Sequence, residues 1–233
     1  MQGLMEREIT GASEKRSYDD YVVECAARLF LRDGIEGVKM VDIAAEANMG
    51  VATLYRHFST KARIAVSAAT LLWSKFNDLL VTLVESEGFL ELNGIGRMQV
   101  LLEAYCDAYV AYGDFVSFLD EFDHLVVAGQ LDKQELVEYG RELDSFYPIF
   151  EDAYLLGRMD GSIVREVAFR PLYLALAHAL IGVAQKMQRG EIIPSDDFSH
   201  GREELQSMVD MALWSLAADV SIPEIPANMH LRG

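Results

Sequence analysis

The chain has 233 residues, of which 51% are hydrophobic and 24% charged, and its formal net charge is −17. This length fits one or two domains, and the composition supports a sizeable core and excludes a disordered chain. The 5 prolines are too few for a fold of many short strands, and the 2 cysteines cannot build a disulfide framework, so we expect a helical protein in a reducing cytoplasm.

The charge is spread unevenly along the chain. Residues 1–64 have a net charge of −1, whereas residues 65–233 have a net charge of −16. No acidic residue occurs between Glu46 and Asp78, and this window contains four basic residues: Arg56, Lys61, Arg63 and Lys75. A polyanion is repelled by most of the molecule but not by this window, so the local charge matters more than the total.

The first 64 residues predict an arm followed by short helices. Residues 1–16 read as a loose arm, and apolar positions at three- and four-residue spacing predict a helix over 18–33 that Gly34 ends as a C-cap. A short helix is predicted over 40–47, a break at 48–50 and another short helix over 51–57. Ser59 or Thr60 is expected to cap a long helix from Lys61 towards Glu85.

The rest of the chain predicts further helices and no strands, so the predicted fold class is all-α. The ranges are 95–112, 115–128, 132–156, 171–189 and 201–218, with a tail at 221–233. Asp132 with Glu135 is typical of a capping-box start, and Pro148 should kink or divide the 132–156 helix. The N-terminus lacks the apolar run of a signal peptide, and the longest apolar stretch, 172–184, is too short to span a bilayer. We therefore expect a soluble protein with no membrane partner.

The two short helices around residues 48–50 predict a helix-turn-helix. Two helices joined by three residues cross steeply, and Ala44 and Ala47 are small enough to lie at the crossing. Asn48 tolerates the positive φ that such a turn needs. The second helix then projects residues 51–57 outward, as required of a helix that enters the major groove of DNA.

These residues resemble the DNA-binding domain of the TetR family over 22–66. The resemblance rests on residues 26–30, Gly34, Ile43, Ala44, Ala47, 54–58 and Lys61. It implies base contacts from Val51, Ala52 and Thr53, phosphate contacts from Tyr55, His57 and Lys61, and a further backbone contact from Lys39. Arg56 lies on the same outer face. The family usually has glycine at the position of Asn48 and often serine or threonine at that of Gly50, where glycine removes a side-chain cap and DNA phosphate can hold the helix end.

Plainer interpretations of this segment stay open. Tyr55 shares a helix with Leu54 and Phe58 and can be a core aromatic, Arg56 can be a solvated charge, and the whole unit can be a three-helix bundle without DNA affinity. Val51 and Ala52 offer only apolar contacts, such as one to a thymine methyl group. We therefore expect DNA shape or water-mediated contacts to supply part of any specificity.

The resemblance also implies a homodimer on a palindromic operator, formed by the helices at about 171–189 and 201–218. The apolar residues that the pattern displays on them are Leu172, Leu176, Ala179, Leu180, Val183, Leu205, Met208, Val209, Ala212, Leu213 and Leu216. The alternative is that these residues form an ordinary core within one subunit.

Segment 105–154 holds 11 of the 23 aromatic residues of the chain, which favours a pocket for a hydrophobic or aromatic effector. The candidate ligand-binding residues are Trp73, Phe76, Tyr105, Tyr109, Phe118, Phe122, Phe150, Tyr154 and His178. Core packing is the alternative for each aromatic. Asp120, Asp123 and His124 resemble a metal cluster only superficially, and Cys25 and Cys106 read as core thiols, so no metal and no cofactor are predicted.

Together these features predict a ligand-responsive transcriptional regulator. Its domains are the helix-turn-helix unit at 17–64 and a ligand-binding and dimerisation domain at 65–220. A repressor is favoured because occupancy of an operator alone blocks transcription, and the effector is expected to shift the fourth helix and separate the recognition helices. An activator, or a helical protein-interaction module, is the alternative. Enzyme activity is not expected, since no catalytic motif occurs.

Overall fold

The computed structural model describes residues 18–129, 131, 133–190 and 197–217. Within them the regular structure is helical, as the sequence predicts. The helices are α2 (Tyr18–Gly37), α3 (Met40–Glu46), α4 (Val51–Phe58), α5 (Lys61–Val84), α6 (Glu87–Leu90), α7 (Gly94–Ala111), α8 (Gly113–Val127), α9 (Val137–Asp144), α10 (Phe146–Asp160), α11 (Phe169–Arg189) and α12 (Gly201–Ala217). The predicted arm at 1–16 and tail at 221–233 lie outside the described residues.

The segment predicted over 132–156 is divided into two helices, α9 and α10, as expected from Pro148, but the first begins only at Val137. The break falls at Ser145, whose hydroxyl donates to the Glu142 carbonyl at 2.6 Å and competes with the helical ladder. Pro148 occupies the first turn of α10, where its missing N–H costs nothing. The proposed capping residue Asp132 lies outside the described residues. The short helix α6 was not predicted.

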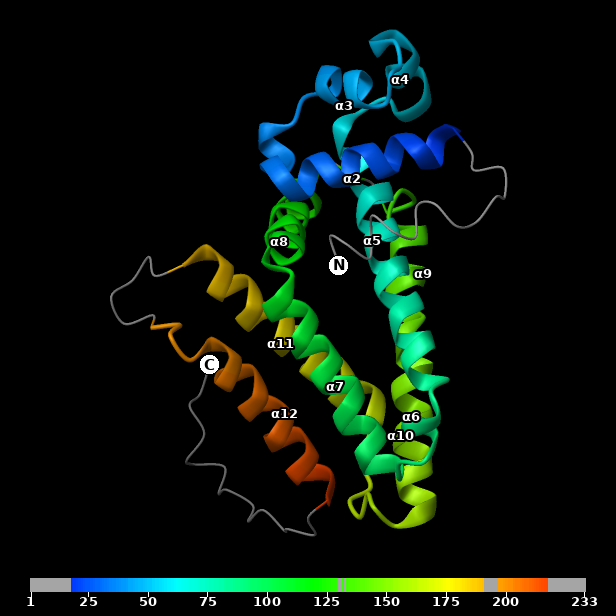
Figure 1. The fold of residues 1–233 in the computed structure, drawn as a ribbon, viewed down its shortest axis with the longest axis vertical. Coiled ribbons are helices and arrows are strands. Elements are labelled where there is room, and N and C mark those ends of the chain that lie inside the picture. Colours follow the sequence, from blue (N-terminus) through cyan, green and yellow to red (C-terminus); the bar gives the residue numbers. More distant parts are fainter. Residues whose placement is uncertain (1–17, 130, 132, 191–196, 218–233) are drawn as a thin grey trace, which may run out of the picture.

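The helices form an elongated molecule with the helix-turn-helix at one end (Figure 1). There α2 lies across the ends of α5 and α8, and α3 and α4 lie beyond it, at the extremity. Helices α5, α9 and α10 run down one side of the body, and α7, α11 and α12 down the other. This places α4 far from the loop that joins α10 to α11.

One hydrophobic core runs through both parts of the molecule. Phe30 of α2 stacks on Phe118 of α8 with ring centroids 6.1 Å apart, and Phe118 stacks in turn on Phe122 at 6.3 Å. The predicted boundary at residue 64 falls inside α5, which begins beside α4 and ends in the body. The helix-turn-helix is therefore carried on a rigid shared helix.

Helix α5 is long and apolar enough to cross a membrane by length and composition alone. Half of its most apolar 18-residue window is buried inside the protein. Ala65, Ala69 and Leu72 are among the residues it buries. Such burial is typical of a core helix in a soluble protein, so the helix is weak evidence for a membrane span.

Candidate nucleic-acid interface and ligand pocket

Small buried residues hold α3 and α4 together. Ala44, Ala47 and Leu54 are buried at the crossing, which leaves no room for larger side chains. Asn48 in the turn adopts φ 50°, as predicted from its tolerance of the left-handed region. The Met49 N–H donates to the Ala44 carbonyl at 2.8 Å and closes the turn. The angle of α4 is thus fixed by packing and by backbone hydrogen bonds.

Gly50 is the N-cap of α4. As predicted, this end of the helix has no side-chain cap, because glycine has no side chain. Its carbonyl accepts from the Thr53 N–H at 2.9 Å and from the Leu54 N–H at 3.1 Å, so the first turn is regular. No acidic residue lies in that turn. The positive end of the helix dipole is therefore left uncompensated by carboxylates of α4.

The outer face of α4 is open to solvent. Val51 is 37% exposed and Tyr55 is 48% exposed, while Leu54 is fully buried. Ala52 and Arg56 are exposed as well, and Thr53 is half-buried. This exposure argues against Tyr55 as a core aromatic, since Leu54 alone supplies the buried face of the helix.

Two of the predicted phosphate ligands already have partners within the chain. His57 Nδ1 lies 2.8 Å from Asp19 Oδ1, which orients the ring and leaves Nε2 as its free edge. The Lys61 ammonium donates to the carbonyls of Ile35 and Val38 at 2.6 and 2.8 Å. A phosphate contact by Lys61, which stays a prediction, would compete with these bonds.

Lys39 is the N-cap of α3 and is exposed. Its own backbone N–H donates to Asp42 Oδ2 at 2.8 Å, so its role in the helix start uses the backbone and not the ammonium. The side chain of Lys39 is therefore available at the surface.

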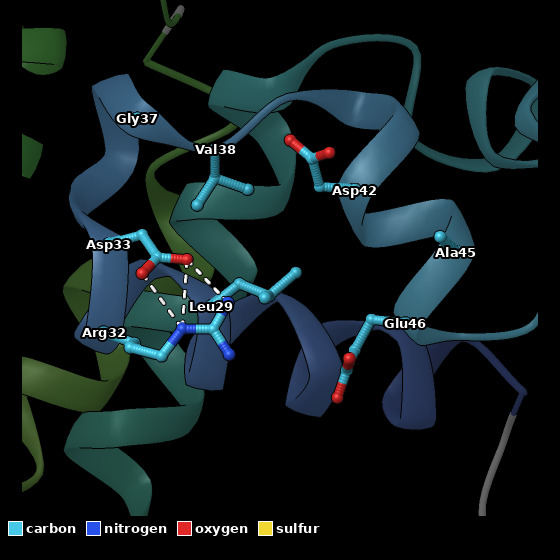
Figure 2. A pocket seen from close by; sticks show the side chains of 8 residues that line it. All are labelled: Leu29, Arg32, Asp33, Gly37, Val38, Asp42, Ala45 and Glu46. Atoms are coloured by element: carbon cyan, nitrogen blue, oxygen red, sulfur yellow. Dashed lines mark hydrogen bonds and ion pairs between the residues drawn. The ribbon is translucent and has the colours of Figure 1, made fainter.

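A polar groove of about 490 Å³ lies between the end of α2 and α3 (Figure 2). Asp33, Asp42 and Glu46 line it together with one cation, Arg32. The Arg32 guanidinium binds the Asp33 carboxylate at 2.6 Å, as the dashed lines show. The lining of this groove has more acidic than basic side chains, although Arg28 also pairs with Glu46 at 3.4 Å, so it is less favourable to a polyanion than the acid-free face of α4.

A hydrogen-bonded junction ties the helix-turn-helix to the body. The Glu121 carboxylate of α8 accepts from the backbone N–H of Ile35 at 2.5 Å and of Glu36 at 3.1 Å. These two residues follow Gly34, which has φ 72° and ψ 160° and interrupts α2. Lys61 of α5 binds the carbonyls of the same turn. The last turn of α2 is thus held from both ends by α5 and α8.

A second pocket, of about 470 Å³, lies inside the body among α5, α7, α8, α9, α10 and α11. The residues that line it are Trp73, Tyr105, Tyr109, Leu119, Asp123, Tyr139, Gly140, Leu143, Asp144, Phe146, Tyr147, Arg170, Tyr173, Leu174, Ala177, His178, Ile181 and Gln185. Its volume suits a small organic molecule, and its wall is mostly apolar with a few polar groups, as in typical ligand sites.

The structure brings four of the predicted ligand residues into this pocket: Trp73, Tyr105, Tyr109 and His178. The other five lie in the packed core and do not line it: Phe76, Phe118, Phe122, Phe150 and Tyr154. The Tyr154 hydroxyl is bound to the backbone of Val167, which fixes it in place. Four aromatic residues of the wall were not among the candidates: Tyr139, Phe146 and Tyr147 of the aromatic-rich segment, and Tyr173. Which aromatic side chain lines a cavity depends on contacts between distant helices.

The polar groups of the pocket form separate pairs. Arg170 lies 3.3 Å from Asp144 Oδ1 and its guanidinium also stands over the Tyr147 ring, 4.8 Å from the centroid. The Gln185 amide donates to Asp123 Oδ2 at 2.8 Å. Burial raises the pKa of the Asp123 carboxyl, and the hydrogen bond from Gln185 opposes that shift.

Asp120, on the same helix as the pocket residue Asp123, pairs with Arg189. Arg189 Nε lies 3.0 Å from Asp120 Oδ2, and the Arg189 side chain lowers the pKa of that carboxyl through its hydrogen bond. Within the described ranges, no three His, Cys, Asp or Glu side chains are grouped as metal ligands.

Helices α11 and α12 bury part of the face that the sequence pattern displays. Leu180, Leu205, Val209, Ala212 and Leu216 are buried in the core of the subunit. The same helices nevertheless expose other apolar side chains, with Met211 64% exposed and Trp214 81% exposed. An exposed tryptophan beside an exposed methionine is an unusual solvent surface and typical of an interface.

Residues 22–71 match the family model described as bacterial regulatory proteins of the tetR family. No curated protein matches the chain in sequence.

Several solved structures share the fold. A transcriptional regulator from Saccharomonospora viridis in complex with choline has a TM-score of 0.62 and 21% identity, covering 82% of this chain and 95% of that chain. A TetR transcriptional regulator from Rhodococcus sp. RHA1 has a TM-score of 0.58 and 15% identity over 88% of this chain and 100% of that one. The regulator FadR from Bacillus subtilis in complex with stearoyl-CoA has a TM-score of 0.55 and 12% identity over 86% and 98%.

Proposed function

This chain belongs to the TetR family of bacterial regulatory proteins, and from that premise we propose that it is a cytoplasmic, non-enzymatic repressor released from its operator by a small effector. The observation that carries the proposal is the outer face of α4. It is exposed, free of acidic residues and placed at the extremity of the molecule (Figure 1). We assign DNA binding to residues 17–64, and effector binding and dimerisation to residues 65–220.

On DNA, the first turn of α4 would meet base edges in the major groove. Val51 and Ala52 supply apolar contacts to thymine methyl groups, and Thr53 supplies a hydroxyl. Tyr55, Arg56 and the free edge of His57 would reach phosphates, where they fix the register without reading sequence. The bulk of the chain, with its net negative charge, is repelled from the duplex, so binding through α4 is the favoured orientation.

A binding assay tests this assignment. Fluorescence anisotropy would be measured with a labelled duplex selected from a random-sequence pool, as a function of salt. Arg56→Ala should weaken binding to specific and unspecific duplexes alike and lower the salt slope by about 1 if the guanidinium contacts one phosphate. Arg165→Ala, which removes an exposed cation from the loop between α10 and α11, is the matched control and should change neither quantity.

Two outcomes would count against the DNA-binding assignment. The first is wild-type protein that retains no duplex even at low salt. The second is equal loss of affinity in the Arg56→Ala and Arg165→Ala variants, because a general charge effect would then explain the binding.

We propose that Met211 and Trp214 are covered by the same helices of a second copy. Gly182 on α11 is exposed with open space above its Cα, which permits close approach of another helix there. A two-fold dimer presents two copies of α4 to successive grooves, which is how a short recognition helix gains affinity for a palindrome.

Substitution of one methionine at the proposed interface and one away from it tests the dimer surface. Met211→Glu should dissociate the dimer in sedimentation analysis, since burial of two carboxylates at the interface is costly. Met159→Glu alters an 85% exposed methionine at the end of α10 and should leave the mass unchanged. A monomeric wild-type protein, or an unaltered dimer in Met211→Glu, would refute this surface.

The pocket inside the body is the proposed effector site. The structural relatives solved with choline and with stearoyl-CoA support this assignment, since each was solved with an organic ligand. Helix α5 carries Trp73 into the pocket and Lys61 onto the last turn of α2, and α8 carries Leu119 and Asp123 into the pocket and Glu121 onto the same turn. An effector that shifts either helix would therefore reorient α4 by a population shift.

Repression is favoured over activation because operator occupancy alone suffices to block transcription. In vitro transcription from the bound promoter decides between them. A repressor lowers the transcript level when added without effector, whereas an increase would make the activator reading correct.

A further inference from the structure

The fold by itself does not select a ligand, because the structures similar to this one were solved with ligands as different as choline and stearoyl-CoA. The chemical class must come from the wall of the pocket. Seven aromatic side chains contributed by five helices line the cavity of about 470 Å³.

The rings are fixed by contacts with one another. Trp73 meets Phe146 with centroids 5.5 Å apart and ring planes at 71°, and Tyr105 meets Phe146 at 6.1 Å and 68°. In such edge-to-face packing, a ring that offers its edge to a neighbour can turn its face elsewhere. Ring faces carry the negative part of the aromatic quadrupole and attract cations within about 6 Å.

The phenols of this wall are neutral at physiological pH. Burial raises the pKa of Tyr139 to about 12, and burial raises the pKa of Tyr105 and Tyr109 above their ordinary value. The rings therefore act through their faces and hydroxyl dipoles and not as phenolates.

The charged groups of the wall leave one carboxylate for a ligand. The cation Arg170 is matched by Asp144 and stacks on Tyr147, so its charge is already engaged. Asp123 is hydrogen-bonded to Gln185, a neutral amide. Two nearby residues are engaged with Asp120: Arg189 with its carboxylate, and His124 Nδ1 with its carbonyl at 2.7 Å.

We propose that the effector is an organic cation, with an alkylated ammonium or a cationic heteroaromatic group held against the ring faces and its charge opposite Asp123. The inference rests on the proposed function, because it specifies the effector of the same pocket. The net charge of −16 over residues 65–233 adds a field that attracts cations and repels anions.

The test compares two ligands of nearly the same shape by calorimetric titration of the full chain without DNA. The probes are benzyltrimethylammonium and neopentylbenzene, in which carbon replaces the nitrogen, both at one fixed concentration of co-solvent. The cation should bind at least about tenfold more tightly than the neutral isostere, which is the size of one desolvated cation–π contact. The anion 4-phenylbutyrate should bind more weakly than either.

Two variants then test whether Asp123 is the group that faces the positive charge of the ligand. Asp123→Asn should weaken binding of the cation by about tenfold and leave binding of the neutral isostere unchanged. Asp152→Asn, the same change at an exposed site of α10, is the control and should alter neither affinity. The wild-type ratio of the two ligands needs no variant, so a fold defect in Asp123→Asn would not obscure the result.

Equal or tighter binding of the neutral isostere or of the anion would overturn the inference. So would unchanged cation affinity in a folded Asp123→Asn variant. These failures are distinct from failure of the proposed function, which the DNA-binding assay measures without any ligand. A protein that binds its operator but prefers the neutral probe refutes only the cationic class.

Discussion

Replacement of Gly34 by alanine perturbs the junction between the helix-turn-helix and the body at its tightest point. The backbone there has φ 72° and ψ 160°, a region that side chains with a Cβ rarely enter, at a cost of about 1–3 kcal/mol. An added Cβ would lie 2.5 Å from Glu121 Oε1, so the carboxylate must move. Its displacement leaves the N–H groups of Ile35 and Glu36 without this acceptor; the Ile35 donor is the less exposed of the two, and its loss costs about 1–3 kcal/mol.

The expected loss of unfolding free energy in Gly34→Ala is therefore about 2–6 kcal/mol, from the sum of these two effects. In a domain of this size such a loss lowers the Tm by roughly 4–24 °C. Gly129→Ala is the matched control, because Gly129 has φ 68° with open space around it and isolates the backbone effect. It should lose clearly less than Gly34→Ala.

Urea unfolding followed by circular dichroism measures both variants, and a double-mutant cycle with Glu121→Ala separates the two causes. Once Glu121 is truncated, alanine at position 34 should cost less, since the clash is gone and only the backbone effect remains. Strictly additive losses, or a Gly34→Ala variant as stable as the wild type, would refute the described junction.

Three further perturbations follow from single contacts. Gly94→Ala should destabilise strongly or prevent folding, because its Cβ would lie 2.0 Å from the backbone nitrogen of Gly157 where α7 meets α10. Gly140→Ala, in the interior of α9 with open space around it, should instead raise the free energy of unfolding measured in urea by up to about 1 kcal/mol. Lys61→Met should lower the Tm, because the contacts of its ammonium with two carbonyls are lost, and should leave the salt slope of DNA binding unchanged. A salt slope reduced by about 1 would instead show that Lys61 contacts a phosphate. Burial raises the pKa of the Cys106 thiol to about 11, so a thiol-reactive dye at pH 8 should label Cys106 only after denaturation, and rapid labelling of the native protein would contradict this burial.

The helix-turn-helix was predictable because its signals are local. The small residues Ala44 and Ala47, the positive φ of Asn48 and the apolar spacing of α2 each act within a few residues of the chain. The sequence predicted that Pro148 would kink or divide the 132–156 segment, and the structure divides it at Ser145, which leaves the proline in the first turn of α10. The spacing of apolar residues does not reveal that the Ser145 hydroxyl donates to the Glu142 carbonyl, so the exact position of the break could not be predicted.

The ligand pocket could be predicted only in outline. An excess of aromatic residues in 105–154 indicates many rings near one another but not which of them face a cavity. Phe118 and Phe122 belong to the ring stack that links α8 to α2, so they do not line the pocket. Tyr173, far along the chain on α11, does line it. Such outcomes depend on how distant helices pack, and neither composition nor periodicity encodes that.

The most direct test of the central claim is a hydroxyl-radical footprint of the wild-type protein on a selected duplex. If α4 of each subunit enters the major groove, two protected patches should appear on one face of the duplex, with centres separated by one helical turn or a multiple of it. The combined Tyr55→Ala and Arg56→Ala changes, which leave the buried Leu54 in place, should abolish both patches in a protein that is still folded. An undiminished footprint in that variant would show that another surface holds the DNA.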